Sequence, residues 1–355
     1  MKLAKVGLIG CGRVGTYYIK ILKSKKIKNC NVVSVCDLDT KKSKFFSKHL
    51  KCKAYKDYKD LEFYKDIDAV LILTPSGSHF EIAKFFLKKK INVICEKPLT
   101  MIPKNSLILH NIAKKNNVIC TVVFQNRFNK SIKFLKKIIE KKKFGKIVSV
   151  SLSLLWCRYQ KYYEDGWHGT WLNDGGVTNQ QAIHHIDIMR WLFGPILSVC
   201  SVAENRLNRL EAEDTMHAVL KFNKHFNGNI EITTAARPKD LHASLSVVGE
   251  KGTMVISGVG LNKIQLLHLK GLKETVLETK KKHSEKVFTG YGNSHIFYLG
   301  EIFKRIIKNK KIPLVSGKEA YKTSKLIHAL YKSSENKKWI NVNDKNLSKK
   351  LGYNN

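Results

Sequence analysis

Apolar positions in the first third of the chain gather in short runs that alternate with stretches of helical spacing. Short continuous apolar runs indicate strands buried on both faces, as in a parallel sheet whose crossover helices cover both sides. Strands are predicted at residues Ala4–Ile9, Asn31–Cys36, Ala69–Leu73, Asn92–Cys95 and Val118–Phe124, with helices beginning near Arg13, Thr40, Ser78 and Pro103. The pattern therefore predicts a doubly wound α/β domain with a parallel sheet over residues 1–125.

The hydrophobic pattern changes after residue 125. A helix to about Glu140, a strand at Lys146–Trp156, an aromatic loop and a helix at Thr178–Phe193 are predicted first. Alternating runs then follow at Leu197–Ala203, Met216–Phe222, Gly228–Thr234, Ala243–Val248 and Thr253–Ile256, before two helices at Ser294–Lys308 and Gly317–Ser334. Alternation is typical of a half-buried antiparallel sheet. Residues 126–355 are thus predicted to form an α+β domain with an open sheet, and packing of the last helix on the first domain is left open.

The chain is strongly basic, with 65 Lys and Arg residues, 28 Asp and Glu residues and a formal net charge of +37. A clustered excess of this kind would indicate nucleic-acid binding, because Lys and Arg neutralise phosphates. Here the lysines are scattered in short runs such as Lys88–Lys90 and Lys280–Lys282, without a recognisable nucleic-acid module. We therefore expect no nucleic-acid partner, although the positive field would attract an anionic substrate such as a nucleotide sugar.

Membrane and metal signals are weak in the sequence. No run of about 18 apolar residues occurs, so we expect no membrane partner and a cytoplasmic location. The eight cysteines occur singly, without a C-x-x-C pair, and predict neither a zinc site nor a disulfide framework. A length of 355 residues with 43% hydrophobic content is instead typical of two packed globular domains.

A glycine-rich segment follows the first predicted strand and opens the first predicted helix. Its sequence is Gly10-Cys11-Gly12-Arg13-Val14-Gly15, the G-x-G-x-x-G pattern of dinucleotide-binding turns. Gly10 would make the tight turn, Gly12 would let backbone N–H groups reach a pyrophosphate, and Gly15 would allow close packing of helix and strand. The segment therefore predicts a Rossmann domain that binds a nicotinamide dinucleotide at a helix N-terminus.

Asp37 ends the second predicted strand. A carboxylate at this place accepts hydrogen bonds from the adenosine ribose hydroxyls and would repel a 2′-phosphate. No arginine replaces Asp37 or Asp39, so the sequence favours NAD over NADP. The alternative is that Asp37 only caps the next helix.

Three further segments together indicate a family. Thr74-Pro75-Ser76-x-x-His79 and Glu96-Lys97-Pro98 each follow a predicted strand, and Gly175-Gly176 precedes His184-His185-Ile186-Asp187. Over essentially the full chain, this combination resembles the glucose-fructose oxidoreductase and inositol dehydrogenase (Gfo/Idh/MocA) family. The resemblance implies a Rossmann domain, a second α+β domain with an open sheet, and a homodimer or homotetramer.

The resemblance implies that Lys97 lies beside the nicotinamide and takes part in proton transfer, with His184 as its partner. Independently, hydride transfer from an alcohol carbon leaves a proton to remove, and burial near a cationic ring lowers the pKa of a lysine. His185 would point about 100° away from His184 around a helix, so we expect only one of them to face the substrate. The predicted cofactor-binding residues are Gly10, Gly12, Arg13, Val14, Gly15, Asp37, Thr74, Pro75, Ser76, His79, Glu96, Lys97 and Asn126.

The sequence departs from the commonest family pattern at Gln180, where many members carry aspartate. An amide can only hydrogen-bond, so either Lys97 would carry more of the proton transfer or the substrate would supply a charge. Asn179-Gln180-Gln181 would bind sugar hydroxyls. Members that act on nucleotide-linked sugar acids also lack that aspartate. The predicted substrate-binding residues are Lys97, Trp167, Trp171, Asn179, Gln180, His184, Arg237 and Tyr291. Arg237 and Tyr291 are candidates for the anionic or nucleotide part, although Arg237 could instead pair across the sheet. Trp167 and Trp171 lie in the aromatic loop Asp165–Trp171, which would place rings on a sugar or the nicotinamide or could equally be a packed structural loop.

We therefore predict an NAD-dependent oxidoreductase that acts on a secondary hydroxyl of a sugar. A nucleotide sugar such as UDP-N-acetylglucosamine or its uronate, in surface-polysaccharide biosynthesis, is the first candidate substrate. Free inositol or another free sugar or polyol is the second. A catalytically silent NAD-binding sensor is a third hypothesis, against which the presence of both Lys97 and His184 argues.

Overall fold

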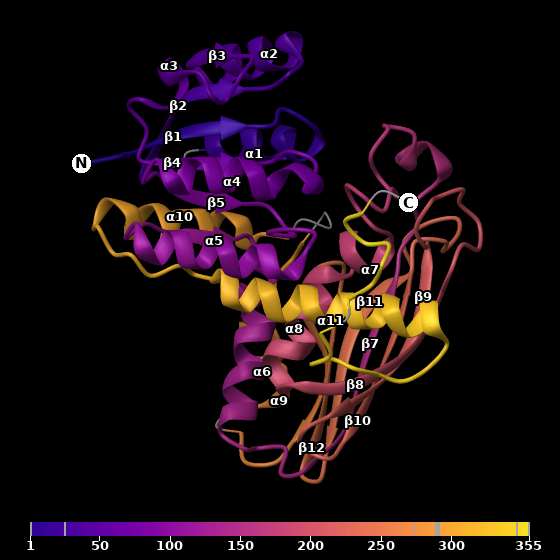
Figure 1. The fold of residues 1–355 in the computed structure, drawn as a ribbon. Helices are drawn as coiled ribbons and strands as arrows, with labels where there is room; N and C mark the ends of the chain where they lie inside the picture. The colour runs from indigo at the N-terminus through magenta and orange to yellow at the C-terminus, as the bar shows by residue number, and fades with distance from the viewer. Residues whose placement is uncertain (1, 25, 273, 288–291, 346, 354–355) are drawn as a thin grey trace. The chain divides into compact units, whose positions relative to one another are not determined.

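A computed structural model describes residues 2–24, 26–272, 274–287, 292–345 and 347–353 (Figure 1). The chain divides into two compact units. The first comprises the residues up to 123 together with 295–322, and the second comprises 124–294 and 323–355. The chain therefore returns to the first unit near its end, in addition to the change near residue 125 that the sequence pattern predicts.

The first unit contains a six-stranded parallel sheet in the order β3-β2-β1-β4-β5-β6. The strands are β1 (Ala4–Ile9), β2 (Cys30–Cys36), β3 (Lys53–Tyr55), β4 (Ala69–Ile72), β5 (Asn92–Cys95) and β6 (Cys120–Val122). Every residue of β4 and β5 is buried, because the sheet is covered on both faces. The predicted doubly wound parallel fold is confirmed, and β3 is an additional short edge strand that the sequence pattern missed.

Helices connect the strands of the first unit. They are α1 (Arg13–Lys23), α2 (Thr40–Leu50), α3 (Leu61–Tyr64), the 3₁₀ turn η1 (Ser76–Ser78), α4 (His79–Lys88) and α5 (Pro103–Lys115). From the C-terminal part of the chain, α10 (Ser294–Ile307) supplies Tyr298, whose hydroxyl donates to the Val122 carbonyl at 2.5 Å. The glycine loop and the segments after β2, β4 and β5 thus lie at the carboxyl ends of parallel strands, where α/β sheets bind ligands.

The second unit is built on an eight-stranded sheet in the order β13-β12-β11-β7-β10-β9-β8-β14. Its strands are β7 (Ile147–Leu155), β8 (Ile196–Glu204), β9 (Thr215–Phe222), β10 (Asn227–Thr233), β11 (His242–Gly249), β12 (Gly252–Ser257), β13 (Lys263–Leu269) and β14 (Ile340–Asn341). Within this sheet, β7 and β10 are the only neighbouring described strands that run parallel. The predicted mostly antiparallel sheet is confirmed, with β13 and β14 as strands that the pattern missed.

The helices of the second unit differ from the sequence prediction at one place. They are η2 (Gln125–Phe128), α6 (Lys130–Glu140), η3 (Gln160–Tyr163), α7 (Val177–Gln180), α8 (Ile183–Phe193), α9 (Val276–His283) and α11 (Gly317–Asn336), whose residues up to Lys322 count with the first unit. The single helix predicted at Thr178–Phe193 is two helices, because the Val177 carbonyl accepts from both Gln181 and Ala182 and regular bonding restarts at Ala182.

Because β7 and β10 run parallel, several loops lie at one end of the strands of the eight-stranded sheet. Both strands end there, and β9 begins there because Thr215 pairs with Thr233. We call residues 156–158, 205–214 and 234–240 the loop edge. None of the helices in the described part of the chain is long and apolar enough to cross a membrane.

Candidate functional site

The glycine loop after β1 has the geometry that a tightly bound pyrophosphate requires. Gly10 has a φ of +97°, and a Cβ there would lie 2.7 Å from the backbone of Leu73. A Cβ on Gly15 would lie 2.9 Å from the Gly10 carbonyl and from the Phe46 ring of α2. A Cβ on Gly12, by contrast, would meet no atom within 4 Å, so this glycine leaves open space over the N-terminus of α1. These three environments fit a bound dinucleotide.

Asp37 fastens the end of β2 to the glycine loop. Its carboxylate accepts the N–H of Cys11 at 2.7 Å and the N–H of Asp39 at 2.8 Å. The cap of α2 is Asp39, which accepts the N–H groups of Lys41 and Lys42. Helix capping is therefore done by Asp39, and Asp37 lies half-buried beside the turn where a ribose would bind.

His79 links the segment after β4 to the segment after β5. It is 1% exposed, with Nδ1 2.7 Å from the Pro98 carbonyl and Nε2 2.9 Å from the Thr74 carbonyl. Burial lowers the pKa of His79, against the effect of both carbonyls. Ser78 adds a hydrogen bond from its hydroxyl to the Thr74 hydroxyl at 2.7 Å. The ring of His79 therefore holds two predicted cofactor-binding loops together.

Glu96, in the Glu-Lys-Pro segment, is a buried carboxylate with partners from α1 and α10. Its Oε1 accepts the Tyr18 hydroxyl at 2.5 Å and lies 3.6 Å from Nε2 of His295, and its Oε2 accepts the Lys97 N–H at 3.2 Å. Although burial raises the pKa of Glu96, His295, Tyr18 and Lys97 together lower it to about 2. The contacts of this carboxylate therefore lie inside the first unit, and one of them is to the backbone N–H of the half-buried Lys97.

Tyr18 and His295 were not predicted as site residues. Tyr18 is fully buried on α1, and the Tyr17 ring lies edge-on to His295 at 5.2 Å between centroids. In the sequence, Tyr18 has the pattern of an ordinary core position of an amphipathic helix. His295 ends the segment Gly290–His295, which resembles stretches of some family members, but nothing in that segment links it to Glu96. Their role follows only from the fold, because 78 residues separate Tyr18 from Glu96.

In the second unit, α7 and α8 carry the polar residues of the predicted sugar face. Gln180 is 8% exposed, and the side-chain amide of Asn179 donates to the Asp174 carbonyl at 2.7 Å. His184 is half-buried, with its ring edge-on to Phe124 at 5.9 Å. Asn126 of η2 is also buried and accepts the side-chain amide of Gln125 at 3.2 Å.

The two adjacent histidines of α8 have different environments. His185 is 1% exposed and packs edge-on against the Trp156 ring at 5.8 Å. Burial lowers the pKa of His185 to about 4, so its ring is neutral near pH 7. Of the two, only His184 is partly accessible, so it is the histidine that could reach a substrate.

Asp187, the aspartate of the segment His184-His185-Ile186-Asp187, is buried and bound by side chains of the second unit. Asp187 accepts two bonds of 2.6 Å from the Arg127 guanidinium and one of 2.6 Å from the Thr323 hydroxyl. Arg190 lies 3.5 Å from the same carboxylate. Arg127 and Asp187 are 6% and 1% exposed at their side chains, so this ion pair joins η2 to α8 inside the second unit.

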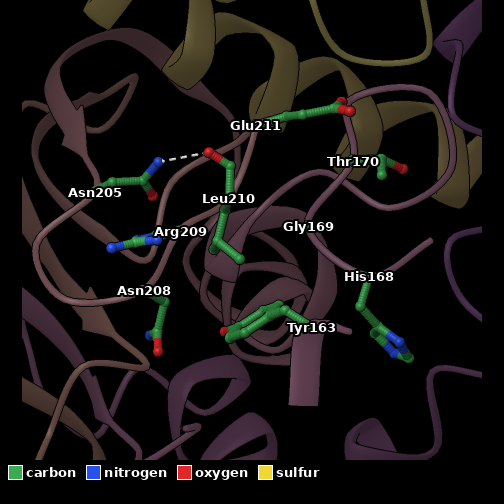
Figure 2. Close-up of a pocket in the computed structure, with 9 residues that line it drawn as sticks. All are labelled: Tyr163, His168, Gly169, Thr170, Asn205, Asn208, Arg209, Leu210 and Glu211. Carbon is green, nitrogen blue, oxygen red and sulfur yellow. Dashed lines mark hydrogen bonds between the residues drawn. The ribbon is translucent and has the colours of Figure 1, made fainter. Parts of the chain in front are cut away.

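The aromatic loop borders a cavity of about 640 Å³ in the second unit (Figure 2). The cavity is lined by Tyr163, His168, Gly169, Thr170, Asn205, Asn208, Arg209, Leu210 and Glu211. The rings of Trp167 and His168 are tilted by 34° with centroids 3.7 Å apart, and the Asp165 carboxylate lies 2.6 Å from Nδ1 of His168. Trp171 is instead buried against Tyr331, edge-on at 5.2 Å. The cavity thus lies between the aromatic loop and the loop edge.

Arg237 is an exposed cation of the loop edge whose hydrogen bonds are to neutral groups. Its guanidinium donates to the Thr234 and Ala236 carbonyls and to Asn208 Oδ1 at 3.2 Å, with a longer 3.8 Å contact to Cys157 Sγ. It also lies 4.5 Å from the centre of the Tyr159 ring. Because Asn208 also lines the cavity, Arg237 is adjacent to it. Tyr291, the other candidate for an anionic group, lies outside the described residues.

The predicted site residues divide between the two units. The glycine loop, Asp37, the segment Thr74–His79, Glu96 and Lys97 belong to the first unit, and the predicted sugar-binding residues of α7, α8 and the loop edge belong to the second. Within the described residues, no group of His, Cys, Asp and Glu is arranged to hold a metal ion.

Comparison with known proteins matches both parts of the chain to family models. Residues 4–124 match the NAD-binding Rossmann fold of an oxidoreductase family, and residues 136–342 match its C-terminal alpha/beta domain; both models carry the name GFO_IDH_MocA. Among curated proteins, the myo-inositol 2-dehydrogenase of Thermotoga maritima is 25% identical over 351 residues, covering 96% of this chain and 99% of that protein.

Solved structures with similar folds include two dehydrogenases in complex with NADH and UDP-GlcNAcA. The WlbA dehydrogenase of Chromobacterium violaceum is 28% identical, with a TM-score of 0.88 over 96% of each chain. The WlbA dehydrogenase of Bordetella pertussis is also 28% identical, with a TM-score of 0.88 over 96% of this chain and 98% of its own.

Proposed function

Because this chain belongs to the Gfo/Idh/MocA oxidoreductase family, we propose that it transfers hydride between NAD and a secondary hydroxyl of a nucleotide sugar. Family membership makes it an NAD-dependent oxidoreductase that acts on CH–OH groups. The substrate class is our proposal, with UDP-N-acetylglucosamine or its uronate first. The observation that carries it is the similarity, along 96% of the chain, to two dehydrogenases solved with NADH and UDP-GlcNAcA.

We propose that Lys97 is the proton acceptor of this reaction. NAD, when bound at the glycine loop, supplies the hydride acceptor, so the hydroxyl that loses hydride from its carbon must also lose a proton. Lys97 follows β5 at the ligand-binding edge of the parallel sheet, and the neighbouring Glu96 carboxylate is committed to Tyr18. His184 is proposed to hydrogen-bond the same hydroxyl, on the strength of the family resemblance and its partial exposure.

The experiment that tests the function follows absorbance at 340 nm with purified protein. NAD and NADP are each tried against UDP-sugars, UDP-uronates, inositols and free sugars, and co-purified cofactor is identified by mass spectrometry. Turnover of a UDP-sugar or UDP-uronate is expected. Turnover of free polyols alone would replace the proposal with the inositol dehydrogenase activity that the Thermotoga maritima relative carries in its name. No turnover with NAD bound would favour a sensor.

Asp37→Ala should reduce the preference for NAD over NADP. The variant removes the carboxylate that we propose accepts the ribose hydroxyls and repels a 2′-phosphate, a proposal supported by its hydrogen bond to the Cys11 N–H of the glycine loop. Dissociation constants for NADH and NADPH, from fluorescence titration, should converge by roughly tenfold or more, as expected for loss of hydrogen bonds to a charged group. Asp39→Ala is the control, because it removes only the cap of α2 and should leave the ratio unchanged. An unchanged ratio in Asp37→Ala would exclude Asp37 from the ribose site.

Arg237→Ala should raise the KM for the UDP-sugar by roughly 10- to 100-fold, the loss expected for charge-assisted hydrogen bonds to a phosphate or carboxylate. The proposal rests on a guanidinium whose hydrogen bonds are to neutral acceptors and which adjoins the cavity through Asn208. Steady-state kinetics with Arg237→Lys should recover part of the loss. Lys239→Ala, an exposed cation on the same loop, is the control. If both alanine variants behave alike, Arg237 does not bind the anionic part.

A further inference from the structure

Glu213, in the loop between β8 and β9, is a buried acid that contacts the start of α7. It is 3% exposed, and its main-chain carbonyl accepts the Val177 N–H at 3.0 Å. Its side-chain Oε1 accepts the Thr178 N–H at 2.9 Å. One residue therefore binds two of the N–H groups that the first turn of a helix leaves without a partner inside the helix.

Tyr331 of α11 completes this arrangement. Its hydroxyl donates to Oε1 of Glu213 at 3.0 Å and accepts the Gly176 N–H at 3.1 Å. The backbone at Gly176 approaches so closely that a Cβ there would lie 2.3 Å from Oε2 of Glu213 and 2.0 Å from its carbonyl oxygen. The second glycine of the Gly175-Gly176 pair is thus required by Glu213.

The second carboxyl oxygen of Glu213 is in an energetically unfavourable environment. Oε2 is buried and has no hydrogen-bond partner in the described part of the structure. Burial raises the pKa of Glu213 to about 7, against the bonds from Thr178 and Tyr331. An apolar side chain would fill the same space without burying a polar group. The acid is therefore present for its bonds to α7.

Backbone hydrogen bonds connect the first turn of α7 to α8. The Val177 carbonyl accepts from Gln181 at 3.1 Å and from Ala182 at 2.8 Å. The Ala182 carbonyl in turn accepts from His185 and Ile186, each at 2.9 Å. Gln180 ends α7, and His184 lies in the first turn of α8. A shift of the Val177 peptide would therefore displace both of these side chains.

We propose that Glu213 is a positioning residue of the dehydrogenase, which together with Tyr331 holds the first turn of α7 and so sets the positions of Gln180 and His184. This inference rests on the proposed function, in which those two side chains contact the sugar. Glu213 itself contacts neither substrate nor cofactor in this proposal. Its effect is on the geometry of the reacting hydroxyl, for which misplacement by about 1 Å costs roughly 100-fold in rate.

The test compares Glu213→Ala with Glu213→Gln in the full-length protein. Alanine removes the Oε1 acceptor and should lower kcat by roughly 10- to 100-fold. Glutamine retains an acceptor oxygen and should restore kcat to within about fivefold, the factor that corresponds to the roughly 1 kcal/mol of one neutral hydrogen bond. The Kd for NADH should stay constant, because all the predicted dinucleotide-binding residues except Asn126 belong to the first unit. Glu204→Gln, an exposed acid paired with Arg206, is the control.

Hydrogen exchange measured by mass spectrometry supplies a readout that does not depend on the substrate. Amides of residues 176–186 should exchange faster in Glu213→Ala than in Glu213→Gln, while those of β4 and β5 should not change. Tyr331→Phe removes a single hydroxyl and should show the same direction of change even if Glu213→Ala does not fold. Normal exchange and normal kcat in Glu213→Ala, or equal losses in the alanine and glutamine variants, would overturn the proposal. If the wild type turned over no sugar, the proposed function would fail, and exchange alone would decide whether Glu213 holds α7.

Discussion

Lys97→Ala should lower kcat by roughly 10²- to 10⁴-fold, the usual contribution of a positioned acid–base group. The neighbouring Glu96 is a poor substitute for the lost amine. Its carboxylate accepts the Tyr18 hydroxyl and the Lys97 N–H and lies beside His295. Its pKa is also lowered to about 2, by His295, Tyr18 and Lys97 against the effect of burial, so it is a weak base. Stopped-flow absorbance at 340 nm and steady-state kinetics measure the loss.

The same variant should still bind NADH, because the contacts that we propose between the dinucleotide and the glycine loop and Asp37 do not involve the lysine amine. Lys97→Met retains the apolar stem without the charge and should lose as much activity as alanine, which separates proton transfer from packing. Lys104→Ala, on the exposed side of α5, is the matched control and should remain fully active. Retention of more than a tenth of wild-type turnover by Lys97→Ala would show that another group accepts the proton.

The sequence alone was sufficient to predict strands that are buried along their whole length. Strands β4 and β5 are buried along their whole length, and such strands appear in the sequence as continuous apolar runs. Strand β3 was missed because it is three residues long and Lys53 and Ala54 are exposed at the sheet edge. Strand β14 has only two residues, so it has no periodicity to detect. Pattern analysis thus finds the centre of a sheet more readily than its margins.

The site was predictable where its residues adjoin in sequence. The glycine loop is a local turn with a positive φ at Gly10, so the motif alone identifies it, although Gly10 and Gly15 make close approaches to the distant residues Leu73 and Phe46. The contacts that hold the motif residues come from distant segments. Glu213 and Tyr331, for example, are 118 residues apart, and both bind the first turn of α7. Contacts of this kind leave no periodic or spacing signal in a single sequence.

Asp187→Ala should destabilise the second unit by about 3–5 kcal/mol, the usual effect of removing one partner of a buried ion pair. The variant leaves the Arg127 guanidinium, 6% exposed, without its bidentate carboxylate. It also removes the acceptor of the Thr323 hydroxyl. Arg127 and Arg190, which both contact the Asp187 carboxylate, would then lie close together with no anion between them, so their charges would repel. Thermal unfolding followed by circular dichroism should show a Tm lower by roughly 6–20 °C.

The Asp187 prediction also decides what the aspartate of the His-x-x-Asp segment does. Glu140→Ala removes an exposed partner of Lys136 on α6 and should change stability by less than about 1 kcal/mol. Asp187→Asn, which retains an acceptor oxygen and loses the charge, should fall between the two alanine variants. If Asp187→Ala kept its Tm and lost only turnover, the aspartate would act in the chemistry. If Tm falls as expected, the aspartate holds in place the helix that carries His184.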